Sequence, residues 1–542
     1  PQVRVDLLGD ETPRSLLTNL QQNQIINFKI ADPLILISEY VLKKYTINGT
    51  IKDTKNGESL IGASIQLNNS TLGTITNGYG YYSLTVPEGS YAVHVSHVGF
   101  RKFETQIDLR QNINLNVSMA PSVTKLEEVQ INSISSNVNI SSSVPSVTRI
   151  KINDKGDQIP YLLGAVDLIQ NAFLHPGIST TGEDANGFHV RGGRVDQNLI
   201  LLDEATIYNP NHYIQVSIFN PEAVNDVKIL KGFIPPSYGG RASSVVEVRQ
   251  KEGNTKKMSY SGGIGPFSAR ALVEGPFRKG KSSFLASVRQ SLLNLDVNDF
   301  ASTSVRRDRF SFTDVNLKIN SKPNKYNSYY LSGYFGNDRN AFGLNSLSNW
   351  GNRMVNFRWN HVFSPRIFSN LSSYVSEYSY RNESFDEPGS FVSRSRIVDY
   401  SVKSDITYSF NPKNNLNFGF SSIFHRLKPG DREPFIFSTV DINTIRLDTE
   451  HGLESGTYLN HELELGRFSF NYGLRYSLFH SFGPDDVRVY EAGLPFSDST
   501  IIDTVSFSKR EVIKFYNHAE PRLSLNWRLL DHTSLKASYS KM

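Results

Sequence analysis

The chain has 542 residues, enough for several domains, and no cysteine, which excludes disulfides and thiolate metal sites. Its formal net charge of +5 is too small to argue for nucleic acid as a partner. Mean hydropathy is −0.35 and no apolar run approaches the ~18 residues of a spanning helix, which excludes a helical membrane protein but is compatible with a membrane β-barrel.

The first 45 residues predict part of a small α/β domain. Thr12-Pro13 predicts a helix start, because proline favours the first helical position. Two short strands are predicted to follow, at 27–30 and 34–38.

Residues 46–119 alternate polar and apolar side chains with period two, as at Tyr91, Val93 and Val95, between turns such as Asn77-Gly78. This pattern predicts a small antiparallel β-sandwich. Residues 120–158 are rich in Ser, Val and Asn and are predicted to be a linker. Within this linker, "KLEEVQIN" (125–132) is predicted to be extended.

Residues 159–254 predict a mixed α/β domain. Pro160 opens a predicted helix that runs to Phe173. Glycine-punctuated strands are predicted after this helix, at 188–190, 197–202, 227–231 and 244–249.

From Lys257 onward, strands of about 9–14 residues alternate apolar and polar side chains, long enough to cross a bilayer when tilted. Short turns alternate with long loops, and the loops are predicted at 335–351, 381–396, 428–456 and 480–513. This alternation is typical of an outer-membrane barrel. We count about 13 strands, and because single-chain bacterial barrels close with an even number, we expect the barrel to continue beyond Met542.

Two short motifs raise the alternative of a nucleotide hydrolase. "GPFRKGKS" (275–282) fits the phosphate-binding pattern G-x-x-x-x-G-K-[ST], and "LILLDE" (199–204) resembles a magnesium-holding strand. A phosphate loop follows a buried parallel strand of continuous apolar residues, whereas the residues before Gly275 alternate. The context therefore favours a hairpin turn of the barrel, and no nucleotide is expected.

Three stretches resemble known families. Residues 46–119, with "GTITNGYGYYSLTVP", resemble the carboxypeptidase-regulatory-like domain, and residues 159–254, with "VRGGRVDQNLILLDE" and "YGGRASSVVEVRQKEGN", resemble the plug of TonB-dependent outer-membrane receptors. Residues 255–542 look like the first part of their barrel, and residues 1–45 resemble part of the secretin and TonB short N-terminal domain. The expected fold is mainly β: a transmembrane antiparallel barrel (22-stranded in the family), an α/β plug and an N-terminal β-sandwich.

The resemblance implies active import of a large, scarce solute across the outer membrane of a Gram-negative bacterium. The N-terminal domains would stand in the periplasm, and TonB would pull on an extended segment by adding it as a strand to its own sheet. The position of "KLEEVQIN" suggests that this segment consists of Leu126, Glu127, Glu128, Val129, Gln130 and Ile131.

The plug resemblance also implies site residues. Arg191 and Arg241 match plug arginines that face acidic groups of the barrel wall, and Asp203 and Glu204 are expected at the same contact. A plug loop that faces the exterior would offer ligand contacts from Asn209, Asn211, His212 and Tyr213.

The resemblance leaves several alternatives open. The chain could be a structural or assembly subunit of a larger outer-membrane complex, or a signalling receptor whose N-terminal domain contacts an anti-sigma regulator. A surface lipoprotein is a further partner that the resemblance raises, beside TonB and outer-membrane lipid. No catalytic residue, metal or cofactor is expected.

Overall fold

The structure is a computed structural model of the 542-residue chain. It describes the following residues: 18, 26–31, 34–39, 43–67, 72–122, 147–151, 161–162, 165–169, 175–180, 187–213, 216–292, 309–342, 345–385, 389–435, 438, 442–530 and 532–542. Within these ranges, no helix has the length and apolar character that a membrane crossing requires.

The N-terminal part contains one described hairpin. Strand β1 (Ile26–Ala31) pairs antiparallel with β2 (Leu34–Glu39), at the two predicted strand positions. The helix predicted from Thr12 lies outside the described residues.

Residues 43–122 form the predicted sandwich of two small sheets, which share a core that includes Ile47, Leu84 and Val93. One sheet has the order β10-β3-β6, with β9 added beside β3, and the other has the order β5-β4-β7-β8. The strands are β3 (Lys44–Asp53), β4 (Ser64–Leu67), β5 (Gly73–Ile75), β6 (Tyr81–Pro87), β7 (Gly89–Ser96), β8 (Phe103–Leu109), β9 (Ile113–Asn114) and β10 (Val117–Met119).

The plug is built on a five-stranded mixed sheet of order β11-β18-β19-β16-β17, in which β16 and β19 are parallel. Its strands are β11 (Val147–Lys151), β16 (Asn198–Leu202), β17 (Ala205–Thr206), β18 (Val224–Leu230) and β19 (Ser244–Gln250), and a second hairpin joins β14 (Ile178–Thr180) to β15 (Phe188–Val190). The start of the predicted helix at 160–173 is wrong, because β12 (Tyr161–Leu162) pairs antiparallel with β13 (Ala165–Val166). Gly164 lies between them, and glycine is among the weakest helix formers.

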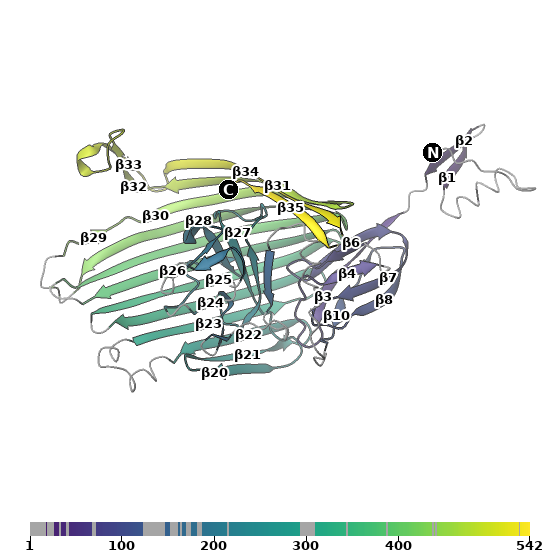
Figure 1. The fold of residues 1–542 in the computed structure, drawn as a ribbon, viewed down its shortest axis with the longest axis horizontal. Coiled ribbons are helices and arrows are strands. Elements are labelled where there is room, and N and C mark those ends of the chain that lie inside the picture. Colours follow the sequence, from purple (N-terminus) through teal and green to yellow (C-terminus); the bar gives the residue numbers. More distant parts are fainter. Residues whose placement is uncertain are drawn as a thin grey trace, which may run out of the picture.

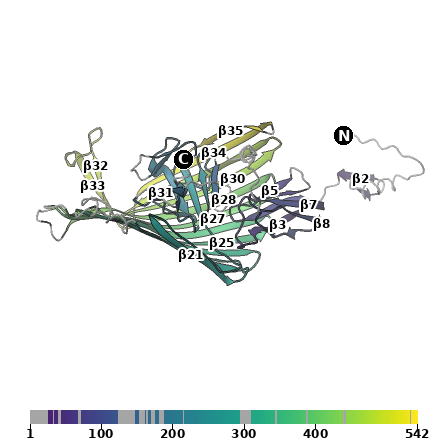
Figure 2. The same ribbon diagram turned by 60° about the horizontal axis from the view of Figure 1, so that its bottom comes forward.

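The C-terminal half is one curved antiparallel sheet that wraps around one side of the plug (Figures 1 and 2). Thirteen strands follow one another along its path, as expected, and the short β29 (Ile445–Arg446) pairs with β28 beside that path. The strands of the path are β20 (Ser259–Ile264), β21 (Ser268–Arg278), β22 (Ser282–Ser291), β23 (Arg309–Ser321), β24 (Asn327–Phe342), β25 (Ser346–Ser364), β26 (Ile367–Ser384), β27 (Phe391–Asn411), β28 (Asn414–Pro434), β30 (Glu450–Leu465), β31 (Phe468–Phe482), β34 (Val512–Leu530) and β35 (Thr533–Ser540). This sheet is called the wall below.

The strands are longer than predicted, so the long loops are shorter. Strand β24 runs to Phe342 and β25 begins at Ser346, which leaves three residues where a loop at 335–351 was expected. A strand of 21 residues, such as β27, spans about 50 Å when tilted by ~45°, well beyond the ~30 Å hydrocarbon core. Where a strand extends beyond the lipid, both of its faces are polar. The alternation of apolar and polar residues that predicts a strand is therefore absent from that part of the sequence. A separate hairpin, β32 (Asp485–Tyr490) and β33 (Ile501–Phe507), occupies the last predicted loop.

The stretch "GPFRKGKS" is a hairpin turn, as predicted. Strands β21 and β22 pair antiparallel on either side of Lys279–Lys281, so neither a parallel strand nor a helix flanks the motif. The Lys281 side chain is exposed.

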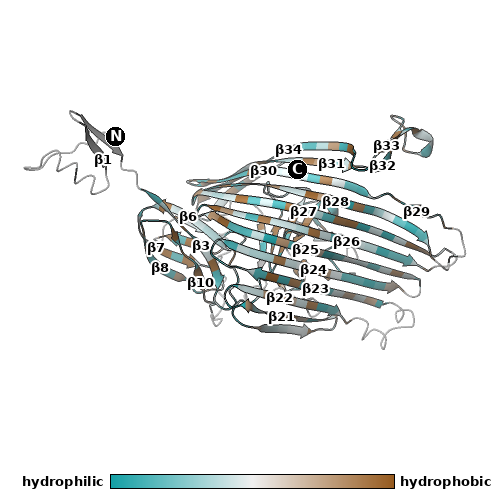
Figure 3. Ribbon diagram, turned by 180° about the vertical axis from the view of Figure 1, so that it is seen from behind, coloured by the Kyte–Doolittle hydropathy of each residue, from teal (hydrophilic) through white to brown (hydrophobic). Residues whose placement is uncertain are grey.

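The two faces of the wall differ in chemistry. Along β23, Leu317 and Ile319 point outward and are exposed, whereas Asn316, Lys318 and Asn320 point toward the plug and are buried. Hydropathy alternates in the same way along the neighbouring strands (Figure 3). The outward positions are suited to lipid and the inward positions to a polar partner.

We expect Val355→Arg to destabilise the wall in a bilayer by about 2–4 kcal/mol, because a lipid-facing arginine near the membrane midplane costs that much. Val355 lies on β25 with 56% of its surface exposed on the outer face. Denaturant unfolding of the full-length protein in lipid vesicles measures the change, and Val355→Leu is the matched control. Equal stability of the two variants would contradict the assignment of this face to lipid.

Candidate functional site

The carboxylates of Asp203 and Glu204 project from a tight turn between β16 and β17. Both residues have positive φ, +47° and +77°, which suits a turn and is uncommon for residues other than glycine. Such backbone strain persists only where the surroundings stabilise it. Here the turn carries both side chains to the wall.

Asp203 is paired with a lysine of the wall. Its Oδ2 lies 2.8 Å from Lys318 Nζ and 2.7 Å from the Ser332 hydroxyl, and the two charged side chains are 1% and 2% exposed. Asn356 of the wall donates to the Asp203 carbonyl. Burial alone would raise the pKa of Asp203, but Lys318 and Arg358 outweigh it and hold that pKa below its ordinary value.

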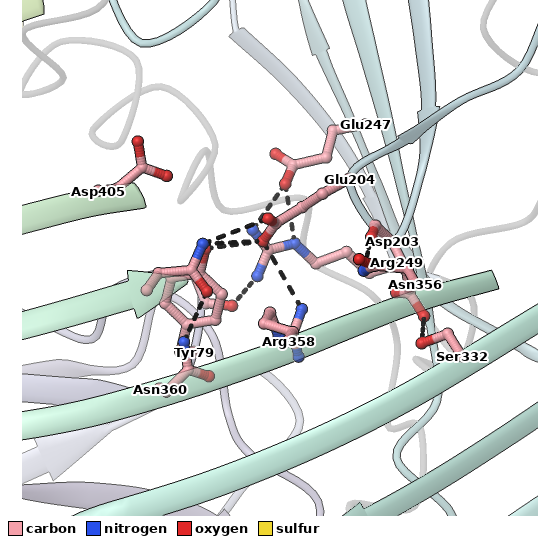
Figure 4. Close-up of polar contacts among 12 residues, drawn as sticks. Tyr79, Asp203, Glu204, Glu247, Arg249, Ser332, Asn356, Arg358, Asn360 and Asp405 are labelled. Atoms are coloured by element: carbon pink, nitrogen blue, oxygen red, sulfur yellow. Dashed lines mark hydrogen bonds and ion pairs between the residues drawn. The ribbon is translucent and has the colours of Figure 1, made fainter. Parts of the chain in front are cut away.

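Glu204 joins three parts of the chain (Figure 4). Its carboxylate accepts the Tyr79 hydroxyl of the sandwich at 2.9 Å and the Asn370 side chain of the wall at 3.2 Å, and it lies 3.9 Å from Arg358. Arg358 also lies 4.1 Å from the centre of the Tyr330 ring. The guanidinium is therefore held between a carboxylate and an aromatic face.

A second pair of charges lies on β19. Arg249 contacts Glu247 at 2.6 Å and donates to the Gly78 carbonyl of the sandwich. Burial opposes the charge on Glu247, but Arg249 and Lys228 together hold its pKa well below the ordinary value. Arg249 therefore links the plug sheet to the sandwich.

A third cluster lies where the plug leads into the wall. Lys322, in the turn after β23, contacts Glu252 at 2.8 Å and donates to Ser59 of the sandwich at 2.9 Å. Burial opposes ionisation of Glu252, yet Lys322 lowers its pKa to about 2. Burial and the Glu252 charge raise the pKa of the neighbouring Glu58 to about 7.

His212 is the centre of a fourth cluster. It is fully buried, with Nε2 3.0 Å from Asp314 and Nδ1 2.9 Å from Asp338 of the wall, and it stacks on Phe312 at 3.9 Å. Arg289 contacts the same Asp314 at 2.6 Å. Burial alone would lower the pKa of His212, but the two carboxylates raise it to about 9, so the ring is charged at neutral pH.

Two wall arginines donate to plug carbonyls. Arg522 donates to the carbonyls of Ile234, Pro235 and Tyr238 at 2.9–3.0 Å, and Arg475 approaches Pro236 O at 3.5 Å. Both side chains are buried. In these contacts the wall supplies the cations, whereas the sequence interpretation placed them on the plug.

The two predicted plug arginines are more exposed than these wall arginines. Arg241 is half-buried and donates to the Gly240 carbonyl. It also interacts electrostatically with Glu454 of the wall. Arg191 is exposed, with φ of +50°. A wall contact remains a prediction for Arg191.

The predicted ligand residues are divided between the interior and the surface. Asn211 and His212 are buried, and His212 contacts two carboxylates of the wall. Asn209 is half-buried, and its carbonyl accepts from Asn352. Tyr213 is 40% exposed, stacks on Phe310 at 4.8 Å and meets Phe342 edge-on at 5.2 Å. Ligand contact therefore remains a prediction chiefly for Tyr213.

A cavity of about 330 Å³ separates the plug from the wall strands β26 to β31. Charged groups of both signs line it, among them Lys228, Glu247, Lys403 and Asp405. At one end the lining includes Asn77, Gly78 and Tyr79 of the sandwich. The predicted TonB-contacting segment, Leu126–Ile131, lies outside the described residues.

The sequence interpretation missed the wall partners and Glu247, Arg249 and Glu252. The alternation along β23 was sufficient to place Lys318 on the inward face, since Leu317 and Ile319 face outward. It could not identify Asp203 as the partner, because 115 residues separate the two.

Family profiles match three consecutive parts of the chain. The CarboxypepD_reg-like domain matches residues 47–131, the TonB-dependent Receptor Plug Domain residues 136–246, and the TonB dependent receptor-like beta-barrel residues 294–541. The chain belongs to the TonB-dependent receptors. They are outer-membrane proteins, so the short turns and the sandwich mark the periplasmic end of the wall.

Two curated receptors are similar in sequence. TonB-dependent receptor SusC of Bacteroides thetaiotaomicron is 27% identical over 259 residues, which cover 44% of this chain and 25% of that protein. TonB-dependent receptor P3 of Formosa agariphila is 22% identical over 324 residues, covering 56% of this chain and 30% of that protein. The chain thus spans less than a third of the length of either relative.

Solved structures share the fold at low identity. Copper transporter OprC matches with a TM-score of 0.53 and 12% identity over 73% of this chain and 64% of that one. The ferric citrate transporter FecA in its unliganded form matches with a TM-score of 0.52 and 12% identity over 76% and 64%. These likenesses show the receptor fold alone.

Lys318→Met should destabilise the receptor by about 3–5 kcal/mol, because it removes the cation that is paired with the buried Asp203 carboxylate. Adding Asp203→Asn to this variant should recover much of the loss. Denaturant unfolding measures both changes, and Lys325→Met in an exposed turn should shift stability by less than about 0.5 kcal/mol. A Lys318 variant as stable as the Lys325 control would contradict the pairing.

The His212 cluster should make plug attachment weaken at alkaline pH. Because the pKa of His212 is raised from 6.5 to about 9, its stabilisation is fully present below pH 6.5 and is lost as pH rises through about 9. Unfolding midpoints between pH 6 and 10 should therefore fall in the wild type and change less in His212→Gln. His94→Gln, on the sandwich, is the control that should retain the wild-type profile. The same pH profile in both variants would refute the assignment.

Proposed function

We propose that this receptor imports a large, scarce solute across the outer membrane, with the plug as its gate and TonB as its source of energy. The observation that carries the proposal is the attachment of the plug to the wall by charge pairs with little exposure, Asp203–Lys318 and Glu252–Lys322 above all. A domain attached in this way obstructs the lumen and leaves only when work is done on it.

The polar character of this attachment supports reversible opening. Ionic and hydrogen-bonded groups that separate can be solvated by water, whereas an apolar interface would remain exposed after separation. The arrangement therefore suits a plug that moves and returns.

Solute would bind at the outer end of the plug. Tyr213 belongs to an aromatic group at the outer ends of the wall strands, with Phe310, Phe342 and Trp350. The Trp350 indole nitrogen and both side-chain polar atoms of Asn211 are buried there without a hydrogen-bond partner. The exposed ring of Tyr213 favours a ligand that has flat faces, and the unpaired polar groups buried beside it would pair with hydrogen-bonding edges that reach them.

Energy would arrive through Leu126–Ile131. In the sequence this segment lies between the last described residue of the sandwich, Ser122, and the plug strand β11, which begins at Val147. Addition of such a segment to a partner sheet gives main-chain hydrogen bonds that resist a pull along the strand.

Deletion of Leu126–Ile131 should abolish energy-dependent uptake, by at least about tenfold, in cells whose growth depends on the full-length receptor, while surface binding of the solute persists. Deletion of Ser133–Val138 shortens the same linker equally and is the control that should retain uptake. A receptor that imports normally without residues 126–131 would refute coupling through this segment. Loss of a copurifying partner, with uptake unaffected, would instead support an assembly role.

A further inference from the structure

The sandwich inserts one turn into the junction of plug and wall. The turn is Asn77-Gly78-Tyr79, between β5 and β6, and it lines the periplasmic end of the 330 Å³ cavity. Figure 4 shows Tyr79 beside Glu204, Arg249 and Arg358. The carboxypeptidase-regulatory-like domain therefore contacts the gate directly.

Tyr79 is fixed on every side. Its hydroxyl donates to Glu204 at 2.9 Å, and its ring stacks on Phe368 of the wall at 5.4 Å. The guanidinium groups of Arg249 and Arg358 lie 5.0 and 5.1 Å from the ring centre. One side chain of the sandwich thus bridges plug and wall.

Gly78 fits the same junction closely. Its carbonyl accepts from Arg249, and a Cβ at this position would lie 2.7 Å from the Arg249 guanidinium. A side chain at this position would have to displace the Arg249 guanidinium.

Further contacts hold the sandwich on both sides of this turn. Tyr81 and Ser83 donate to the Pro365 carbonyl in the β25–β26 turn at 2.9 and 2.7 Å. On the other side, Thr255 N, just after the plug, donates to Asn56 O at 2.8 Å. These hydrogen bonds join a whole domain to the periplasmic mouth of the wall.

We propose that the sandwich domain is a periplasmic seal, whose Asn77–Tyr79 turn closes the cavity between plug and wall and must withdraw before solute can leave through it. The withdrawal step rests on the proposed function. Residues 123–146 join the sandwich to the plug, so one pull on this segment acts on both bodies. Closure itself is independent of transport and can be tested without a solute.

The test of closure uses the absence of cysteine in the chain. Ser401 is 5% exposed and lines the cavity from β27, so Ser401→Cys places a reporter thiol there, with any cysteine outside residues 1–542 replaced by serine. The rate of its reaction with N-ethylmaleimide is measured on the full-length receptor in lipid nanodiscs. We expect slow labelling of the reporter and at least a tenfold faster rate after Tyr79→Ala. Two controls should leave the rate unchanged: Tyr79→Phe, which retains the ring, and Val98→Ala, at an exposed site on the sandwich.

Phe368→Ala tests the same contact from the wall side and leaves every sandwich residue intact. It should also accelerate labelling, because Tyr79 and Tyr81 both stack on this ring. Fast labelling of the receptor that carries the reporter alone, or unchanged rates in both alanine variants, would overturn the seal.

A disulfide tests withdrawal in a receptor without the reporter. A Cβ on Gly57 would lie 3.3 Å from Thr255 Cβ, just below the separation in disulfides, and Gly57 has a φ of +81°, so Gly57→Cys with Thr255→Cys should fix the sandwich in place once the reduced pair is shown to fold. Uptake should be lost in the oxidised pair and restored by reductant. Equal uptake by the oxidised and the reduced pair would overturn the withdrawal step. No uptake by either form would count against the proposed function. In that case the labelling rates alone would decide on the seal.

Discussion

The attachment of the plug to the wall depends on charge pairs formed away from water. Asp203 meets Lys318, Glu252 meets Lys322, and His212 lies between two carboxylates, all with little or no exposure. A buried charge without a partner is costly, so each pair fixes the position of the plug relative to one wall strand. The alternation of the wall follows from this constraint, since one face must satisfy the plug while the other meets lipid.

The Asp203-Glu204 turn shows how this interface couples three bodies. Asp203 pairs with Lys318 of the wall and accepts from Gln250 of the plug, whereas Glu204 accepts the Tyr79 hydroxyl of the sandwich and contacts Arg358 and Asn370 of the wall. Movement of any one body therefore removes a partner from a buried carboxylate. Such shared contacts are a physical reason to expect the sandwich and the plug to move one after the other.

The sequence was sufficient for the architecture and insufficient for the contacts. Period-two alternation and short turns predicted the thirteen-strand path, and the hairpin at 275–282 followed from the same pattern. Strand ends at 342 and 346 were missed because strands beyond the membrane lose their apolar face. The helix predicted from Pro160 was wrong at its start, where β12 and β13 pair as antiparallel strands.

The sequence likewise predicted some residues of the candidate site but not their contacts. Asp203 and Glu204 were identified by position, and the structure places both carboxylates against the wall. No sequence pattern indicates that His212 is enclosed by Asp314 and Asp338, which lie 102 and 126 residues away. Alternation fixes the face to which a side chain points, whereas its partner depends on how the whole sheet curves.

Pulling on residues 123–146 of the full-length receptor in a supported bilayer tests the central claim most directly. A force probe attached there should first release the sandwich and plug, with a gain in contour length of about 3.5 Å for each of their residues, while the wall strands remain in the membrane. Extraction of wall strands before any plug release would contradict the account of a gate held by separable polar contacts.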